Sequence, residues 1–153
     1  MPNPSNTARS VEETLYSVTE ILHDGQQGFQ KIGDEIKDPV LKAYFLDESL
    51  RRAEFRGELE TLLREQGIHD IKEKGTAGGA LRRTWGEFKV KMGGGDHTLL
   101  STAEQGEDAA IQTYEEALAN TDLPLPMRKT LSTQSAHIHA SHDYVKAARD
   151  NSD

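Results

Sequence analysis

Cysteine is absent from the 153-residue sequence, and this absence excludes several kinds of chemistry at once. No disulfide, thiolate nucleophile, iron–sulfur cluster or cysteine-ligated zinc site can form. Aromatic residues are also scarce, at 6%, and hydrophobic residues reach only 35% of the chain. These values predict a single domain with a modest core beneath a charged surface.

Long apolar runs and an excess of positive charge are missing as well. The chain has no apolar stretch long enough to cross a membrane, and its first residues lack the apolar segment of a secretory signal. Its 26 acidic residues outnumber 18 basic ones, which gives a formal net charge of −8. Nucleic-acid binding would need a basic face for the phosphates. We therefore expect a cytoplasmic protein that neither inserts into a membrane nor binds nucleic acid.

Four segments carry apolar residues at alternating steps of three and four, the spacing that places side chains on one face of an α-helix. Ser10 and Glu13 fit a capping box at the start of the first segment, and Asp38 followed by Pro39 fits the start of the second. No alternating β pattern competes with these helices. The pattern predicts helices at about 10–36, 39–66, 96–119 and 126–148, with disordered tails at 1–9 and 149–153.

The connections between these helices predict how they are arranged. Very short links join the first helix to the second and the third to the fourth, so each pair forms an antiparallel hairpin. Residues 68–95 are rich in glycine and include Leu81, Trp85 and Phe88, which predicts a crossover carrying one short helix. The expected fold is all-α: a ferritin-like antiparallel four-helix bundle with a long crossover, formed as one domain by residues 10–148.

Four polar residues fall at the centres of the predicted apolar faces. Glu48 and Arg52 lie within about 20° of the middle of the second helix's stripe. Glu107 and Gln134 occupy similar positions at matching heights in the third and fourth helices. Because a buried charge is costly unless it is paired, these groups are expected to face one another. We predict a structural polar layer in which Arg52 bridges Glu48 and Glu107 and Gln134 completes the network.

A metal site is the alternative interpretation of the same layer. Di-iron bundles use a Glu from each of two helices and Glu-x-x-His from each of the other two. The first helix offers no inward carboxylate here, since Glu20 and Asp24 are predicted on its outer face. The ligand set that remains for one iron or manganese ion consists of Glu48, Glu107 and His137.

The other unusual residues have ordinary structural interpretations. His137, His139 and His142 resemble a metal motif, but positions 137 and 139 point about 200° apart on a helix, so surface histidines are favoured. Gly25, Gly28 and Gly106 lie on or beside the predicted inward faces, where glycine costs a helix about 1 kcal/mol relative to alanine. We expect close approach of neighbouring helix backbones as the reason for them, and a hinge or a small cavity is the alternative.

Short motifs along the chain resemble those of a known family. In order, they are Asp24-Gly25 with Gly28-Phe29, Arg52-x-x-Phe55 with Glu58-Leu59, Gly79-x-x-x-Arg83-x-Trp85, and Gly106-Glu107-Asp108 with Tyr114. Together they resemble a ferritin-like four-helix-bundle family of unknown function, mostly proteobacterial and distantly related to rubrerythrin-type proteins. The resemblance implies the bundle fold and a bacterial cytoplasmic setting, and it implies no established activity. A role in stress response follows only by analogy.

Function is therefore predicted in outline only. The first hypothesis is a non-enzymatic bundle of unknown function that needs no cofactor, and the alternative is a metal-binding redox protein of rubrerythrin or ferritin type with reduced ligation. Residues 72–91 carry six basic and two acidic side chains, so an acidic partner could bind there. Four-helix bundles often dimerise, and a homodimer is the other partner we consider.

Overall fold

The computed structural model describes residues 4–67 and 95–152, and the regular secondary structure of this part of the chain is all helical, with no strand. The all-α prediction is therefore confirmed for the described residues. The predicted short helix in the crossover and the basic segment 72–91 lie outside them. The four helices are α1 (Pro4–Glu35), α2 (Pro39–Glu65), α4 (Gly95–Leu118) and α5 (Leu125–Asp150).

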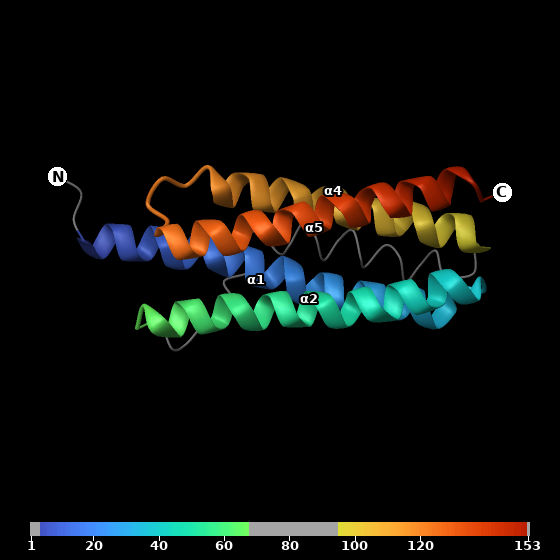
Figure 1. Cartoon of the computed structure of the whole chain (residues 1–153), viewed down its shortest axis with the longest axis horizontal. Coiled ribbons are helices and arrows are strands. Elements are labelled where there is room, and N and C mark those ends of the chain that lie inside the picture. Colours follow the sequence, from blue (N-terminus) through green and yellow to red (C-terminus); the bar gives the residue numbers. More distant parts are fainter. Residues whose placement is uncertain (1–3, 68–94, 153) are drawn as a thin grey trace.

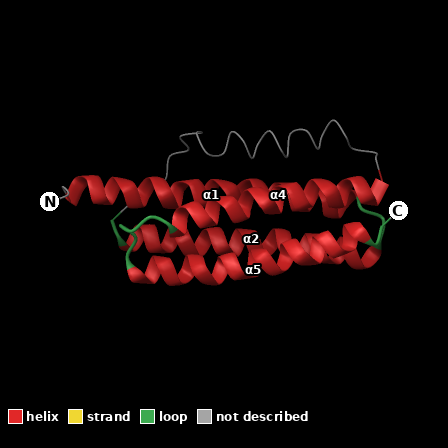
Figure 2. Ribbon diagram, turned by 90° about the horizontal axis from the view of Figure 1, so that it is seen from above, coloured by secondary structure: helices red, strands yellow, loops and turns green. Residues whose placement is uncertain are grey.

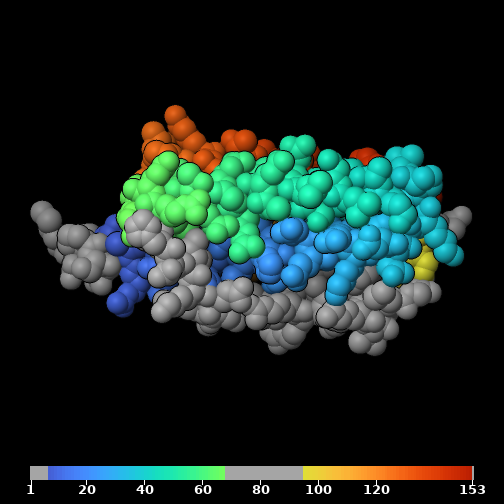
Figure 3. Space-filling model, turned by 90° about the horizontal axis from the view of Figure 1, so that it is seen from below, coloured from blue at the N-terminus to red at the C-terminus, as the bar shows by residue number. Residues whose placement is uncertain are grey.

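The helices pack as two hairpins laid against each other. α1 pairs with α2 and α4 pairs with α5, while α1 also contacts α4 and α2 also contacts α5 (Figures 1 and 2). Each helix runs antiparallel to both of its neighbours (Figure 1). Seen from below, α2 and α1 lie side by side along the length of the molecule (Figure 3). None of the described helices combines the length and the apolarity needed to cross a membrane.

The predicted apolar stripes form the core of this bundle. Full burial of one large aliphatic or aromatic side chain contributes about 1.5–3 kcal/mol, so the stripes dominate the stability of the fold. On α1 and the residue after it, the whole stripe is buried: Val11, Leu15, Val18, Leu22, Phe29, Ile32 and Ile36. The other three helices contribute Phe45, Phe55, Leu59, Leu100, Ala103, Tyr114, Met127, Leu131, Ile138 and Val145.

Two helix ends differ from the prediction. α1 begins at Pro4, so Ser10 lies inside the helix and the predicted capping box is wrong. A proline is well tolerated in a first helical turn, where its missing N–H has no intrahelical partner to lose. Ser10 instead contacts the other hairpin, since Asn120 Nδ2 donates to Ser10 Oγ at 2.9 Å. At the other end, α5 continues to Asp150, two residues beyond the predicted boundary.

The corner between α1 and α2 is closed by two aspartates. Asp38 caps α2, as predicted, by accepting hydrogen bonds from the backbone N–H groups of Val40 and Leu41 at 2.9 and 3.1 Å. Asp96 in the first turn of α4 accepts from the N–H groups of Lys37 and Asp38, also at 2.9 and 3.1 Å. The start of α4 is thereby fixed to the α1–α2 corner.

The face of α1 that was predicted to be exposed to solvent is partly buried. Glu20 is 6% exposed and Asp24 is half-buried, so the prediction that both lie on an exposed face is wrong for Glu20. α1 packs against both α2 and α4, and its buried arc is therefore wider than one apolar stripe.

Close helix approach occurs at Gly33 and not at Gly25. Gly25 is buried, but a Cβ atom built there meets no atom within 4 Å, so the prediction for Gly25 is wrong. A Cβ atom at Gly33 would lie 2.7 Å from Cδ2 of Leu46 on α2 and 3.3 Å from its backbone nitrogen. The α1–α2 hairpin is therefore closely packed at Gly33, near its corner, and leaves room beside Gly25.

Candidate functional site

The polar residues predicted for the core are all buried in the described structure. Glu48 and Arg52 lie one turn apart on α2, Glu107 lies near the middle of α4, and Gln134 lies on α5. Their exposed fractions are 3%, 2%, 0% and 1% respectively. Each replaces an apolar side chain in a stripe, so each must find a polar partner inside the bundle.

Arg52 makes the central contacts. Its Nε donates to Glu48 Oε1 at 3.0 Å, and its Nη2 donates to Glu107 Oε2 at 3.0 Å. The carbon Cζ of its guanidinium lies 4.8 Å from the centre of the Phe29 ring, close enough for a cation–π interaction. One side chain therefore joins α2 to α4 by ion pairs and to α1 by a ring contact.

The charges of this ion network do not balance, because two carboxylates surround one guanidinium. Desolvation by burial would lower the pKa of Arg52, but the carboxylates of Glu107 and Glu48 outweigh it and raise that pKa. Burial raises the pKa of Glu107, and Arg52 offsets that effect only in part. Glu107 Oε1 lies 2.8 Å from Arg52 Nη2 but makes no hydrogen bond. The network therefore favours a proton on Glu107 more than an exposed glutamate would.

His137 connects Glu48 to the edge of the bundle. Its Nε2 lies 2.7 Å from Glu48 Oε1 and 3.1 Å from Oε2, and its ring meets Phe55 edge-on. The side chain is 32% exposed, in contrast to the ion network behind it. His137 is therefore a partly exposed histidine that also contacts the buried layer through Glu48.

Gln134 is buried as predicted, but its hydrogen bonds go to different partners. Its Nε2 donates to the backbone oxygen of Phe55 at 3.1 Å and lies 3.5 Å from Oε2 of Glu58. Its Oε1 accepts from the hydroxyl of Tyr114 at 2.7 Å. Burial raises the pKa of Tyr114, which keeps the hydroxyl protonated as a donor. Gln134 and Tyr114 thus form a second buried polar pair beside the ion network.

Two hydroxyl groups extend the ion network and were not predicted as part of it. Tyr44 and Ser141 share a hydrogen bond with 2.6 Å between their oxygens, and hydrogen bonding from Ser141 lowers the pKa of Glu107. Burial raises the pKa of Tyr44. A usable signal was present in the sequence, since Tyr44 lies one turn before Glu48 on the same helix.

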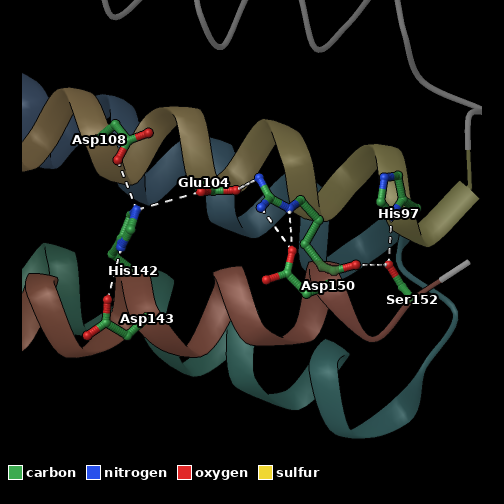
Figure 4. Close-up of polar contacts among 8 residues, drawn as sticks. His97, Glu104, Asp108, His142, Asp143, Asp150 and Ser152 are labelled. Atoms are coloured by element: carbon green, nitrogen blue, oxygen red, sulfur yellow. Dashed lines mark hydrogen bonds and ion pairs between the residues drawn. The ribbon is translucent and has the colours of Figure 1, made fainter.

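The metal ligands expected from the sequence are not arranged as a metal site. Glu48 and His137 are in contact, but Arg52 lies between Glu48 and Glu107. Among the described residues, one group of three side chains brings all of its ligand atoms within 4.8 Å of one another: Glu104, Asp108 and His142. This group lies between α4 and α5, with His142 pointing at the two carboxylates (Figure 4).

The comparison with known proteins gives one family and no activity. No curated protein matches the sequence. A family model described as "Domain of unknown function (DUF2383)" matches residues 10–120, which include most of α1, all of α2 and α4, and the residues Glu48, Arg52 and Glu107. This match covers more than two thirds of the chain, and the protein therefore belongs to the DUF2383 family.

Proposed function

We propose that the protein is a non-enzymatic bundle of ferritin-like arrangement, in which the Glu48–Arg52–Glu107 ion network stands where di-iron bundles hold their metal ions. The observation that carries the proposal is the position of Arg52. Its guanidinium is 2% exposed and donates to both glutamates, so it supplies the positive charge that a metal ion would otherwise bring.

The directions of the helices support the ferritin-like arrangement. The end of α2 and the start of α4 lie at opposite ends of the bundle (Figure 1), as expected if a long crossover connects the two hairpins. Two antiparallel hairpins joined by one long crossover are the ferritin-like connection of a four-helix bundle. Kinship with rubrerythrin-type proteins, a bacterial cytoplasmic setting and a stress-related role stay predictions from the sequence.

The role we assign to the ion network is specification of helix register. A buried ion pair rarely stabilises a fold more than apolar residues of similar size would, because both charges lose their hydration. The ion network instead disfavours other registers of the helices, because moving α2 by one turn relative to α4 would leave charges unpaired in the core. Tyr44 and Ser141 add the same constraint between α2 and α5.

The alternative, a redox site with iron or manganese on Glu48, Glu107 and His137, requires a rearrangement. Arg52 would first have to leave both carboxylates, although it is among the most deeply buried large side chains. Glu107 would also have to be deprotonated to bind a metal ion, and burial disfavours that because it raises the pKa of this side chain.

The test is anaerobic loading with Fe(II), and with Mn(II) in parallel, followed by desalting and measurement of metal per chain. We expect the wild type and Glu107→Gln to retain the same amount of metal, because Glu107 holds none. His142→Ala is the matched control, since it removes the imidazole from the separate group formed by Glu104, Asp108 and His142. Metal that is lost in Glu107→Gln and kept in His142→Ala would overturn the proposal in favour of the redox alternative.

A further inference from the structure

A second group of charged side chains lies between α4 and α5, away from the ion network. Glu104 and Asp108 are one turn apart on α4, and His142 approaches them from α5 (Figure 4). His142 Nε2 lies 2.9 Å from Asp108 Oδ1 and 3.8 Å from Glu104 Oε1. Two helices thus bring an imidazole nitrogen and two carboxylate oxygens to one point.

These separations fit a shared metal ion. Nitrogen and oxygen ligands lie about 2.0–2.2 Å from a transition-metal ion, so adjacent ligand atoms are separated by about 3.0–3.5 Å. The two distances to His142 Nε2, 2.9 and 3.8 Å, lie on either side of that range, and all three ligand atoms lie within 4.8 Å of one another. An ion between them would draw the three side chains closer together.

The second ring nitrogen of His142 faces a further carboxylate. His142 Nδ1 lies 3.2 Å from Asp143 Oδ1, so both ring nitrogens face carboxylates. A metal-binding histidine commonly donates its other ring N–H to a carboxylate, which fixes the orientation of the ring. Asp143 is placed for that contact, with Nε2 of His142 directed at Asp108 and Glu104.

The surroundings position one carboxylate and leave the other accessible. Arg149 donates from Nη1 to Glu104 Oε2, which leaves Glu104 Oε1 on the side of His142. Glu104 and His142 are 12% and 17% exposed, whereas Asp108 is 62% exposed. Glu104 and His142 are therefore mostly shielded from solvent, and water can reach the site on the side of Asp108.

We propose that Glu104, Asp108 and His142 bind one divalent first-row transition-metal ion at the α4–α5 surface. The imidazole ligand favours zinc and its neighbours over magnesium and calcium, which prefer oxygen ligands. Glu104, Asp108 and Asp143 all face His142, and Arg149 is shared between Glu104 and Asp150, so a divalent cation lowers the local excess of negative charge. This site is separate from the ion network and does not rest on the proposed function.

The experiment is calorimetric titration of the full chain with Zn²⁺, repeated with Mg²⁺. We expect one zinc ion per chain and no competition from Mg²⁺. His142→Ala and Asp108→Asn remove ligands and should weaken zinc binding at least about tenfold, and Asp143→Asn should weaken it about tenfold through the orientation of the ring. His139→Ala is the matched control, because it removes an exposed imidazole from the same helix and should leave the affinity unchanged.

Two results would overturn the proposal. One is the absence of saturable zinc binding by the wild type, and the other is wild-type affinity in both His142→Ala and Asp108→Asn. Circular dichroism shows whether each variant is folded, and Asp108→Asn changes a side chain that is mostly exposed, so it keeps the test valid if His142→Ala unfolds. In the wild type, ¹⁵N resonances should show that zinc perturbs Nε2 of His142 more than Nδ1.

Discussion

Arg52 on α2 meets Glu107 on α4 across the diagonal of the bundle, with 3.0 Å between Nη2 and Oε2. α2 and α4 do not pack side by side; each contacts α1 and α5 instead. An arginine is long enough to cross that diagonal, and its planar group binds a carboxylate at each of two positions. The contact therefore ties together two helices whose described residues do not lie side by side.

Removing Arg52 should be the most damaging single change in the core. Arg52→Leu leaves Glu48 and Glu107 buried without their counter-charge, so we expect a loss of about 3–5 kcal/mol in the free energy of unfolding. Urea denaturation at neutral pH measures it. Arg51→Leu is the matched control: residue 51 is exposed on the same helix, and its substitution should cost less than about 0.5 kcal/mol. A loss below about 1 kcal/mol for Arg52→Leu would show that the ion network is not coupled to folding.

The pKa of Glu107 predicts how stability depends on pH. Burial raises this pKa above the ordinary glutamate value of 4.5, so the folded protein holds the proton more tightly than the unfolded chain. The contribution of Glu107 to stability is therefore complete below pH 4.5 and is lost as the pH rises through the raised pKa. Glu107→Gln cannot titrate, so its stability relative to the wild type should increase with pH across this window.

The measurement for Glu107 is urea denaturation of both proteins at several pH values above 4.5. The difference between the two proteins cancels the titration of all other groups. If the wild type instead gained stability over Glu107→Gln as the pH rose, Arg52 would be lowering the pKa of Glu107, contrary to this prediction.

The Tyr114–Gln134 pair should contribute through one hydrogen bond. Tyr114→Phe removes the hydroxyl that donates to Gln134 Oε1 and leaves that buried oxygen unsatisfied, so we expect a loss of about 1–3 kcal/mol. Thermal and urea unfolding both measure it. Tyr144→Phe makes the same chemical change at a side chain that is 41% exposed, and it should leave stability unchanged. Equal effects of the two substitutions would contradict the assignment.

Two glycines of α1 should respond oppositely to alanine. Gly25→Ala adds a methyl group where no atom lies within 4 Å and replaces glycine inside a helix, so it should stabilise by about 0.5–1 kcal/mol. Gly33→Ala places Cβ 2.7 Å from Leu46 Cδ2 and 2.8 Å from Cγ, so either Leu46 or the α1–α2 hairpin must shift. We expect it to destabilise by about 1–3 kcal/mol. Stabilisation by Gly33→Ala would mean that Leu46 moves aside freely.

Helix positions and buried residues could be predicted because they follow from periodicity along one helix. The spacing of Val11 to Ile36 determines which face of α1 is buried, whatever packs against it. The same arithmetic placed Glu48, Arg52 and Glu107 inside, and the cost of unpaired charge then required them to meet. Those contacts are present in the structure.

Features that depend on the rotation and height of one helix relative to another could not be predicted. The tight approach at Gly33 depends on where Leu46 of α2 comes to lie, and periodicity in α1 carries no such information. Gln134 could bond to Arg52 or to Tyr114 from the same helix position, and only the packing decides between them. The Glu104–Asp108 pair was visible as a one-turn spacing, but its histidine comes from another helix.

Asp96 has a consequence for hydrogen exchange. The amide protons of Lys37 and Asp38 bond to a carboxylate on another helix, although they lie in a turn where exchange is usually fast. They exchange when these hydrogen bonds open, either by rotation of the Asp96 side chain or by movement of α4 away from the α1–α2 corner. Slow exchange at this turn would therefore show that the corner stays docked on α4, and it would mark the two hairpins as one cooperative unit.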